Sequence, residues 1–561
     1  MAPELTRRST EAARQLVSAG DDWWRSGVVY QIYPRSFADS DGDGVGDLPG
    51  IIARLDHLAG GPDALGVDAI WLSPIYPSPG RDLGYDVSDY DDIDPLFGTM
   101  ADFERLVAEA HRLGLRVMLD LVMSHTSEEH PWFVDSRLSR SGPYADRYLW
   151  RDPAGWTADH RPLPPNNWVS FFGGQGWEWE SRRGQMYQHI FLPQQPDLDW
   201  RAEGTRSDMW RMVRGWLDRG VDGFRLDTFN NLLKHPDLPS NPRRRGRSPW
   251  ERQTHRHEKD QPDLPTLLDE FRGIVDARPG RMSVGELFDG TVAQAAALTT
   301  PRHLVFDFEL LSQPWSADAL GAAIDRREAA FGPDRWPTVA FGNHDQPRIV
   351  ARWAGDRDPD AVARAAAVMQ LTLRGTPFLY YGEELAVPGI VVPNDQAVDP
   401  PARLAGPDFP WWNRDQARAP MPWTGAPGGG FTTGRPWLPL PLDAGTRNVE
   451  AQRADDTSVL AFYRRILALR RGMPALHRGD FERLATTSPS VLAYGRRAGS
   501  STALVAINLS GRATSTEIAS IDPGTRWRPV LSTHDPSSGP LTDGGRLRLH
   551  SLEAVVFAPE I

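Results

Sequence analysis

The sequence contains no cysteine among its 561 residues. Disulfide frameworks and thiolate metal sites are therefore excluded. No stretch approaches the roughly 20 apolar residues of a membrane-spanning helix. Residues 1–20 hold charged side chains among small ones, without the continuous apolar core of a signal peptide. We therefore expect a cytoplasmic protein with no membrane partner, and a leader removed ahead of residue 1 is the alternative.

The sequence has fewer basic than acidic residues, with 62 Lys and Arg and 74 Asp and Glu, and its net charge is −12. This balance argues against a nucleic-acid partner. The basic run at residues 242–247 is interpreted as a solvated loop and not as a phosphate site. The overall composition is that of an ordinary globular protein, and the length predicts about two to four domains.

Three acidic residues each end a short apolar run of the kind that forms a buried strand. They are Asp227 after residues 221–226, Glu286 after residues 282–285 and Asp345 after residues 339–344. Because parallel barrels place their chemistry where strands end, we expect these carboxyls to converge. Each acid alone could instead cap a helix or pair with an arginine. Together they indicate acid, base and nucleophile chemistry.

Apolar runs alternate with amphipathic segments such as residues 100–113, which predicts a (β/α)8 TIM barrel of the α/β class. The expected barrel strands are residues 28–33, 69–72, 117–122, 223–226, 282–284, 304–306, 338–341 and 377–380. Short alternating runs near the end of the chain predict a small antiparallel domain. Its expected strands are residues 490–494, 502–507, 546–550 and 554–557.

Changes in composition mark the domain boundaries. The long break between the third and fourth strands is rich in Trp, Pro, Gly and Asn, which predicts a loop-rich insertion over the active face. Two further insertions, residues 233–262 and 386–437, follow the fourth and eighth strands. The expected domains are an N-terminal extension (1–20), the barrel (21–124 and 201–477), the inserted domain (125–200) and a C-terminal antiparallel β domain (478–561).

Several blocks together resemble the α-amylase family, glycoside hydrolase family 13. Its four signature regions are matched in order and spacing by Asp120-Leu-Val-Met-Ser-His125, Gly223-Phe-Arg-Leu-Asp227, Gly285-Glu286 and Asn343-His-Asp345. Blocks typical of the α-glucosidase and oligo-1,6-glucosidase branch are residues 29–37, 84–90, 195–200, 375–384 and 418–423. The resemblance covers residues 20–561 and implies that the insertion is the family's domain B.

The resemblance implies a role for each carboxyl in glycosidic cleavage. It assigns Asp227 as nucleophile, Glu286 as general acid and then base, and Asp345 as the acid that binds the distorted sugar. The anomeric configuration would be retained, with the first two carboxyls about 5 to 5.5 Å apart. Strand alternation places Arg225 on the face of Asp227, where its charge would keep that carboxylate ionised. Burial and neighbouring carboxylates would keep Glu286 protonated near neutral pH.

The same resemblance implies how the substrate is bound. His125 and His344 are expected to hydrogen-bond hydroxyls of the sugar in the cleaved subsite. Asp82, paired with Arg418, is expected to hold the terminal glucose, with Tyr85 stacked beneath it. A pocket sealed in this way admits only a chain end and implies exo action.

Two residues concern the acceptor side of the pocket. Phe172 is expected to form a wall of the entrance, and core packing is an equally good interpretation. Thr228 directly follows the nucleophile, and in the branch that the chain resembles, Thr or Ala there accompanies α-1,4 preference and Val accompanies α-1,6 preference.

The function predicted on this basis is a retaining exo-acting α-glucosidase that releases glucose from maltose-like oligosaccharides, with or without transglucosylation. Oligo-1,6-glucosidase, sucrose-acting and trehalose-forming activities of the same family are alternatives. From another class, the alternative is a non-catalytic relative like the transporter heavy chains of this fold. Those proteins carry a membrane span and have lost catalytic acids, whereas this sequence keeps all three acids.

The loop from residue 39 to residue 47 predicts a structural calcium site. Asp39, Asp41, Asp43 and Asp47 stand at positions 1, 3, 5 and 9, and Val45 offers its backbone carbonyl. Hard oxygen ligands at this spacing surround Ca²⁺, and the loop resembles the calcium loop of the same branch. An Asp/Gly turn without an ion is the alternative. No organic cofactor is expected.

Two positions depart from the family pattern. Ser124 stands where the family usually has Asn, which removes a ligand of the calcium site typical of α-amylases and argues against that second site. Asp199 replaces the common Asn of the block at residues 195–200, and the sequence gives no account of its effect.

Overall fold

The computed structural model describes residues 22–405, 413–519, 522, 524–534 and 545–560. The predicted N-terminal extension, residues 1–20, lies outside the described residues. Within the described chain, no helix has both the length and the apolar character needed to cross a membrane.

Among the described residues, eight parallel strands form the central barrel, and each begins and ends within one residue of its predicted position. They are β1 (Val29–Ile32), β2 (Ala69–Leu72), β3 (Arg116–Val122), β9 (Gly223–Asp227), β10 (Met282–Gly285), β11 (His303–Val305), β12 (Thr338–Ala340) and β13 (Thr376–Tyr380). β1 pairs with both β2 and β13. Between β11 and β12, the Thr338 hydroxyl donates to the carbonyl of Val305 at 3.4 Å. The predicted TIM barrel is confirmed.

Amphipathic helices cover the barrel. The longer ones are α6 (Met100–Arg112), α8 (Glu203–Asp218), α9 (Leu264–Asp276), α10 (Val292–Leu298), α11 (Ala317–Phe331), α13 (Pro359–Thr372) and α16 (Val459–Gly472). α6 shows why such segments fold locally, because Thr99 and Asp102 form a capping box at its start. Phe103, Leu106 and Ala110 recur at helical spacing and are buried against the barrel.

Shorter helices occupy the connections. The α-helical ones are α2 (Trp23–Ser26), α3 (Pro34–Phe37), α4 (Leu48–Ala53), α5 (Leu55–Leu58), α7 (Pro131–Ser136), α12 (Ile349–Trp353), α14 (Pro400–Ala405), α15 (Val449–Arg453) and α17 (Pro474–Arg478). The 3₁₀ turns are η1 (Phe229–Asn231), η2 (Trp250–Arg252), η3 (Glu383–Leu385), η5 (Arg414–Ala417) and η6 (Pro427–Gly430). Several of these turns, η1 and η5 among them, directly follow or precede residues of the site.

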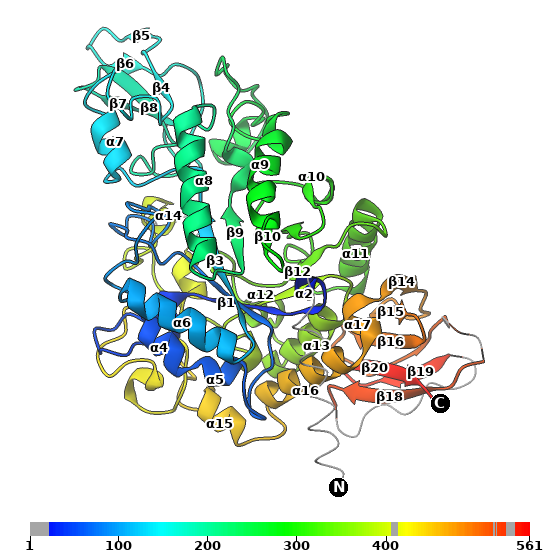
Figure 1. Ribbon diagram of the computed structural model, residues 1–561. Helices are drawn as coiled ribbons and strands as arrows, with labels where there is room; N and C mark the ends of the chain where they lie inside the picture. The colour runs from blue at the N-terminus through cyan, green and yellow to red at the C-terminus, as the bar shows by residue number, and fades with distance from the viewer. Residues whose placement is uncertain (1–21, 406–412, 520–521, 523, 535–544, 561) are drawn as a thin grey trace.

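The inserted segment between β3 and α8 carries small strands of its own. These are β4 (Trp150–Arg151), β5 (Gly155–Trp156), β6 (Pro162–Leu163), β7 (Trp177–Glu180) and β8 (Gln185–Gln188). β8 lies between β4 and β7, and β5 pairs with β6 as a hairpin. Figure 1 shows this segment at one end of the molecule, above β9 and α8.

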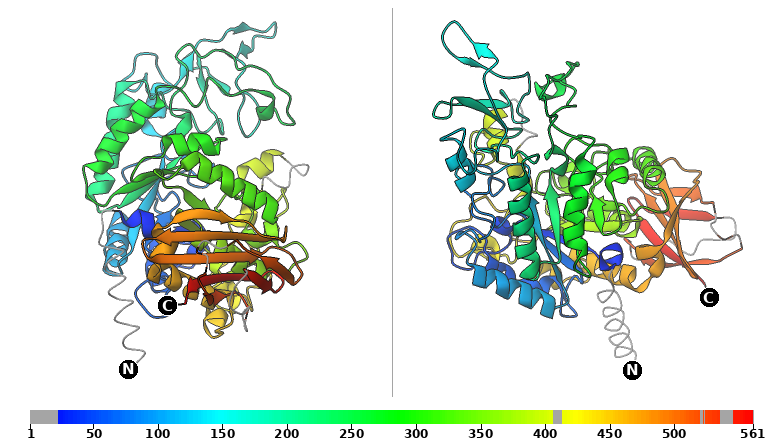
Figure 2. Two further views of the ribbon diagram at one scale, coloured as in Figure 1. Left: turned by 90° about the vertical axis from the view of Figure 1, so that its right-hand side faces the viewer. Right: turned by 45° about the horizontal axis from the view of Figure 1, so that its top comes forward.

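Antiparallel strands form the C-terminal part. They are β14 (Asp480–Leu484), β15 (Val491–Ala498), β16 (Ser501–Asn508), β17 (Thr514–Glu517), β18 (Trp527–Ser532), β19 (Arg546–Leu549) and β20 (Ala554–Pro559). The main sheet has the order β14-β15-β16-β20-β18, and it contacts α11, α13 and α17 of the barrel. Figure 2 shows this sheet at the opposite end of the molecule from the inserted strands.

Candidate active site

The ends of three barrel strands bring the predicted carboxyls together. Asp227 is the last residue of β9, Glu286 directly follows β10, and Asp345 lies in the loop after β12. All three line one cavity of about 560 Å³. Because parallel strands of a barrel end at the same rim, this convergence follows from the fold.

Arg225 lies at the centre of this cluster, on the same strand as Asp227. Its side chain is 2% exposed, and Nη1 donates to Asp120 Oδ1 at 2.7 Å and to Asp227 Oδ1 at 2.6 Å. Nη2 donates to Glu286 Oε2. A planar guanidinium has donors on both sides, so one side chain fixes the relative positions of these carboxylates.

The protonation state of Glu286 is set by burial and by its neighbours. Burial raises its pKa to about 8, and the Asp227 and Asp345 carboxylates add to this effect against the opposing charge of Arg225. A carboxyl with this pKa is protonated at neutral pH and can donate a proton. This is the state that a general acid requires.

Asp345 is held in the opposite state. Burial acts to raise its pKa, but the charges of Arg414 and Arg418 oppose burial, and the pKa stays below the ordinary value of an aspartate. Arg418 Nη2 donates to Asp345 Oδ1 at 2.9 Å, and Arg414 Nη1 lies 3.4 Å from the same oxygen. Glu286 and Asp345 therefore differ in protonation, since Asp345 has two arginines beside it and Glu286 is buried near other carboxylates.

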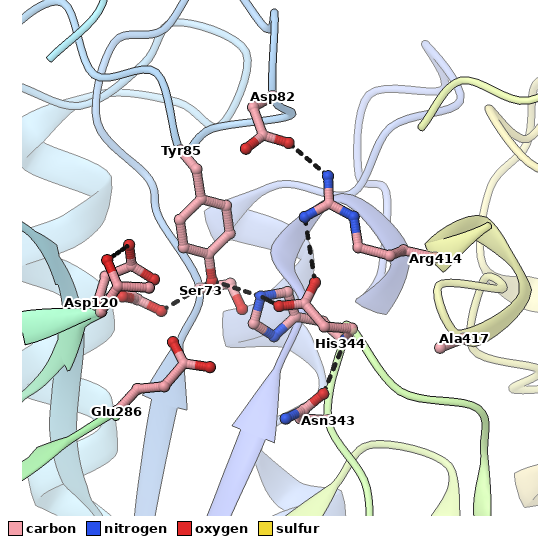
Figure 3. A network of polar contacts seen from close by, with 12 residues as sticks. Ser73, Asp82, Tyr85, Asp120, Glu286, Asn343, His344, Arg414 and Ala417 are labelled. Carbon is pink, nitrogen blue, oxygen red and sulfur yellow. Dashed lines mark hydrogen bonds and ion pairs between the residues drawn. The ribbon is translucent and has the colours of Figure 1, made fainter. Parts of the chain in front are cut away.

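The expected pairing of Asp82 with Arg418 is wrong. Asp82 Oδ1 instead accepts from Arg414 Nη2 at 2.5 Å, and Figure 3 shows Arg414 reaching across to Asp82. Arg418 is only 1% exposed and donates Nε to the backbone carbonyl of His344 at 2.9 Å.

Arg414, and not Arg418, pairs with Asp82 because the two arginines lie at different depths in the fold. Arg414 begins η5 and Arg418 follows its end, so the two side chains emerge about one turn apart. Arg414 lines the cavity, whereas Arg418 is buried with its guanidinium carbon 5.3 Å from the ring centre of Tyr33. Asp399 Oδ1 accepts from Arg414 Nε at 2.7 Å and helps to orient it.

Tyr85 lines the cavity and stacks on His344, with ring centres 5.3 Å apart and planes 1° apart. Gln31 Nε2 donates to His344 Nδ1 at 2.9 Å, so a neutral ring carries its hydrogen on Nε2. That nitrogen lies 2.6 Å from the Tyr85 hydroxyl, which donates to Asp120 Oδ2 at 3.0 Å. Figure 3 shows Tyr85 between Asp120 and His344.

This arrangement occupies both ring nitrogens of His344 with protein groups. Burial lowers the pKa of His344 to about 3, so the ring is neutral. A hydrogen bond from His344 to a sugar hydroxyl stays a prediction. His125 lines the cavity, and its Nε2 lies 2.9 Å from the carbonyl of Tyr85 and 3.0 Å from Gln195 Nε2.

Asp120 is a residue of the site for which no role was predicted from sequence. Besides Arg225 and Tyr85, it accepts from Trp71 Nε1 at 3.2 Å. Burial raises its pKa to about 7, with the Asp227 carboxylate adding to the shift and Arg225 opposing it. The sequence held a signal, because Asp120 opens the block that ends at His125.

Aromatic rings form one wall of the cavity, here called the aromatic wall. Its members are Phe171, Phe172, Phe191, Trp250 and Phe288. Phe172 packs 5.6 Å from Phe191 and also lies 5.6 Å from the guanidinium carbon of Arg414. Phe172 therefore both lines the cavity and packs against another aromatic ring, which are the two interpretations that the sequence allowed. Trp250, from η2, and Phe288, from the loop after β10, were not predicted. Sequence spacing does not show that these two loops meet the inserted domain.

The two departures from the family pattern each have a local partner. Ser124 Oγ lies 2.9 Å from His125 Nδ1 and 3.2 Å from Thr228 Oγ1. Thr228 lines the cavity. Asp199 Oδ1 accepts from the backbone amide of Arg201 at 2.9 Å, in the turn that leads into α8.

The predicted calcium loop follows α3. The carboxylates of Asp39, Asp41 and Asp43 have oxygens within 4.8 Å of one another. Val45 lies in the same turn and donates its amide to Asp43 Oδ1 at 2.7 Å. Asp47 lies outside this group and caps α4, accepting from the amide of Gly50 at 2.6 Å. The structure thus gathers three of the four predicted carboxylates.

Comparisons with known proteins agree with this geometry. Residues 31–479 match the family model described as alpha amylase, catalytic domain. A probable alpha-glucosidase of Rhizobium meliloti (strain 1021) is 44% identical over 526 residues, covering 91% of this chain and 93% of that protein. An oligo-1,6-glucosidase of Heyndrickxia coagulans is 36% identical over 551 residues, covering 92% and 96%. The crystal structure of the alpha-glucosyl transfer enzyme XgtA has a TM-score of 0.88 at 42% identity, covering 96% and 100%. This chain is therefore a member of glycoside hydrolase family 13, the alpha-amylase family, in the branch of α-glucosidases and oligo-1,6-glucosidases.

Proposed function

We propose that the protein is a retaining, exo-acting α-glucosidase that releases α-glucose from the non-reducing ends of short α-1,4-linked oligosaccharides such as maltose. Transfer of the glucosyl group to a sugar acceptor is proposed as a second outcome, supported by the similarity to an alpha-glucosyl transfer enzyme. The observation that carries the proposal is the cavity itself, where Asp227 and a protonated Glu286 meet beside the Asp82–Arg414 pair.

The residues divide the chemistry as follows. Asp227, with Oδ1 held by Arg225, attacks the anomeric carbon while the bond from that carbon to the glycosidic oxygen breaks. Glu286 gives its proton to the departing oxygen, so no free alkoxide forms. A water or an acceptor hydroxyl then attacks the same carbon, Glu286 takes its proton, and Asp227 leaves. Each displacement inverts the anomeric carbon, so the two in succession give net retention of the α configuration.

Exo action is supported by the ion pair at the cavity wall. Asp82 is 4% exposed, and its second oxygen accepts from Gln195 Nε2 at 3.2 Å. Arg414 bridges Asp82 to Asp345, so the pair lies beside the acid that is proposed to bind the distorted sugar. A wall closed by this pair would accept a terminal glucose and exclude a continuing chain, which is what exo action requires.

A second candidate function is oligo-1,6-glucosidase, the activity named for the relative from Heyndrickxia coagulans. Thr228 favours the α-1,4 assignment, because it lines the cavity directly after Asp227. In the branch that the chain resembles, threonine at this position accompanies α-1,4 preference.

We also propose a structural calcium ion at the loop of residues 39–47. Three converging carboxylates fit a hard cation, and bound Ca²⁺ would neutralise their mutual repulsion. Asp39 and Asp43 already accept backbone amides of the loop, so the turn is folded around these side chains. The loop is separate from the cavity, and the ion takes no part in the proposed chemistry.

Product analysis tests the proposed function. The purified protein is incubated with maltose, isomaltose, sucrose and trehalose, and the products and the initial anomer of glucose are identified by NMR. We expect fastest turnover of maltose, with α-glucose formed first. Faster turnover of isomaltose would assign the second candidate function instead, and initial β-glucose would refute retention.

A further inference from the structure

Ser124 lies behind the proposed nucleophile without touching the cavity's acids. It follows β3 and is 1% exposed, and its hydroxyl contacts Thr228 Oγ1 at 3.2 Å across to the end of β9. Thr228 Oγ1 in turn lies 3.2 Å from Asp227 Oδ2. This is the oxygen of Asp227 that Arg225 does not hold, because Arg225 contacts Oδ1. A path of hydroxyls therefore leads from Ser124 to the reacting carboxylate.

Thr228 has an unusual backbone conformation, with φ 38° and ψ 41°. The left-handed region is unfavourable for a β-branched residue and persists only where surrounding contacts enforce it. The backbone carbonyl of Thr228 accepts from the amide of Asn231 at 3.0 Å. Its side chain is fixed by the hydroxyl of Ser124 on one side and by Asp227 on the other.

The carboxylate sets the direction of these hydrogen bonds. An ionised Asp227 can only accept, so the Thr228 hydroxyl donates to Oδ2. Because the Thr228 hydrogen is used in this way, the hydrogen between the two hydroxyls is that of Ser124, which donates to Thr228 Oγ1; Ser124 Oγ also lies 2.9 Å from Nδ1 of His125.

We propose that Ser124 is a positioning residue, whose hydroxyl holds Thr228 in its strained conformation and aims the Thr228 hydroxyl at Oδ2 of Asp227. The inference rests on the proposed function, because it assumes that Asp227 is the nucleophile. Without the Ser124 hydroxyl, the Thr228 side chain keeps only its contact with Asp227 and can rotate away from it. Asp227 then loses a donor to Oδ2, and the acceptor side of the cavity changes shape. Ser124 thereby controls both the turnover rate and the linkage preference.

A double-mutant cycle tests this proposal. Ser124→Ala, Thr228→Val and the double variant are compared with the wild type for kcat and KM on maltose and on isomaltose. Because the hydroxyl acts in the transition state, we expect Ser124→Ala to lower kcat on maltose by about tenfold, with a much smaller change in KM. The maltose-to-isomaltose ratio of kcat/KM should also fall. In the Thr228→Val background, Ser124→Ala should have almost no further effect, since the path is already broken.

Ser283 provides a matched control. It is 2% exposed in β10, and its hydroxyl lies 2.8 Å from Nδ1 of His303, so Ser283→Ala also removes a buried serine hydroxyl from a histidine. We expect a lower melting temperature and an unchanged ratio between the two substrates. An equal shift of the ratio in Ser283→Ala would overturn the proposal, as would additive effects of Ser124→Ala and Thr228→Val.

If Ser124→Ala does not fold, Ser124→Cys keeps the shape with a weaker hydrogen-bonding group, and the same cycle is run with it. Its coupling to Thr228→Val should remain, and additivity would again refute the positioning role. Failure of the proposed function and failure of this inference give different results. A wild type that prefers isomaltose would change the assigned linkage. The double-mutant cycle would still report whether Ser124 acts through Thr228.

Discussion

Each proposed catalytic carboxyl owes its state to its own contacts. Asp227 and Glu286 share the guanidinium of Arg225, yet burial among other carboxylates raises the pKa of Glu286 to about 8. Asp345 has two arginines beside it, and they hold its pKa below the ordinary value despite burial. Acid and base roles at one pH therefore arise from partners and burial, and not from the kind of residue.

Asp227→Asn should abolish turnover of maltose, with kcat lowered more than about a thousandfold, because an amide is too poor a nucleophile to form the glycosyl intermediate. The shape of the side chain is kept, so the melting temperature should change little. Asp222→Asn serves as a control, because Asp222 is also buried at a strand of the barrel but binds His111 and Arg281 instead. It should lose stability and keep kcat. Near-normal turnover by Asp227→Asn would remove the residue from its assigned role.

The raised pKa of Glu286 predicts that activity falls at alkaline pH. Only its protonated form donates to the leaving oxygen, and the pKa is raised to about 8, so kcat/KM should fall as the pH rises through this value. Glu286→Gln should damage maltose turnover far more than that of an activated aryl glucoside, whose leaving group needs no proton. Equal losses on both substrates, measured across a pH series, would contradict the acid role.

Short elements at the cavity place charges that no regular periodicity predicts. The turn η5 (Arg414–Ala417) begins with Arg414, which lines the cavity, and is followed by the buried Arg418, while α14 (Pro400–Ala405) begins beside the buried partner Asp399. The carboxylates of Asp82, Asp345 and Asp399 all contact Arg414. This one side chain therefore connects the loop after β2 with the loops after β12 and β13.

Arg414→Ala should raise KM for maltose by about tenfold or more, because the ion pair that closes the pocket is lost and Asp82 is left without its cation. Arg403 lies in α14 and is exposed, so Arg403→Ala should leave KM unchanged. The products from end-labelled maltopentaose report the same change, since the wild type should release only glucose and Arg414→Ala should also release longer fragments. An unaltered KM together with glucose as the sole product would refute the closing role of Arg414.

The elements themselves were predictable to different degrees. All of the barrel strands are buried on both faces and read as apolar runs, so their positions followed from the sequence. In the C-terminal part, β14, β17 and β18 were not predicted. β14 (Asp480–Leu484) alternates exposed and half-buried residues, and β17 (Thr514–Glu517) is mostly polar. Their pairing with neighbouring strands, and not a local pattern, makes them strands.

Over the whole molecule, the proposed calcium loop joins parts of the chain that are far apart in sequence. Asp39 donates its amide to the carbonyl of Phe431 at 2.8 Å, and its carboxylate accepts from the hydroxyl of Thr432. The amide of Trp437 donates to the carbonyl of Gly44 at 3.0 Å. The loop after β1 thus holds the end of the long segment that follows β13.

Removal of calcium with a chelator should lower the melting temperature by several degrees, because an ion that binds only the folded loop stabilises the fold by mass action. Added Ca²⁺ should restore the melting temperature, whereas Mg²⁺ at the same concentration should do so less well. Substrate preference should not change. A crystal structure from calcium-containing buffer with an ordered loop and no ion would count against the site.

The sequence alone determined the barrel, the order of its strands and the positions of the three carboxyls, because apolar runs and the acids that end them are local patterns. The resemblance to the family rested on the same blocks. The cytoplasmic location stays a prediction. Only the tertiary structure decided that Asp82 pairs with Arg414 and that Ser124 reaches Thr228. These contacts join elements that are distant in sequence, and they depend on how deeply each side chain is buried, which no spacing along the chain reports.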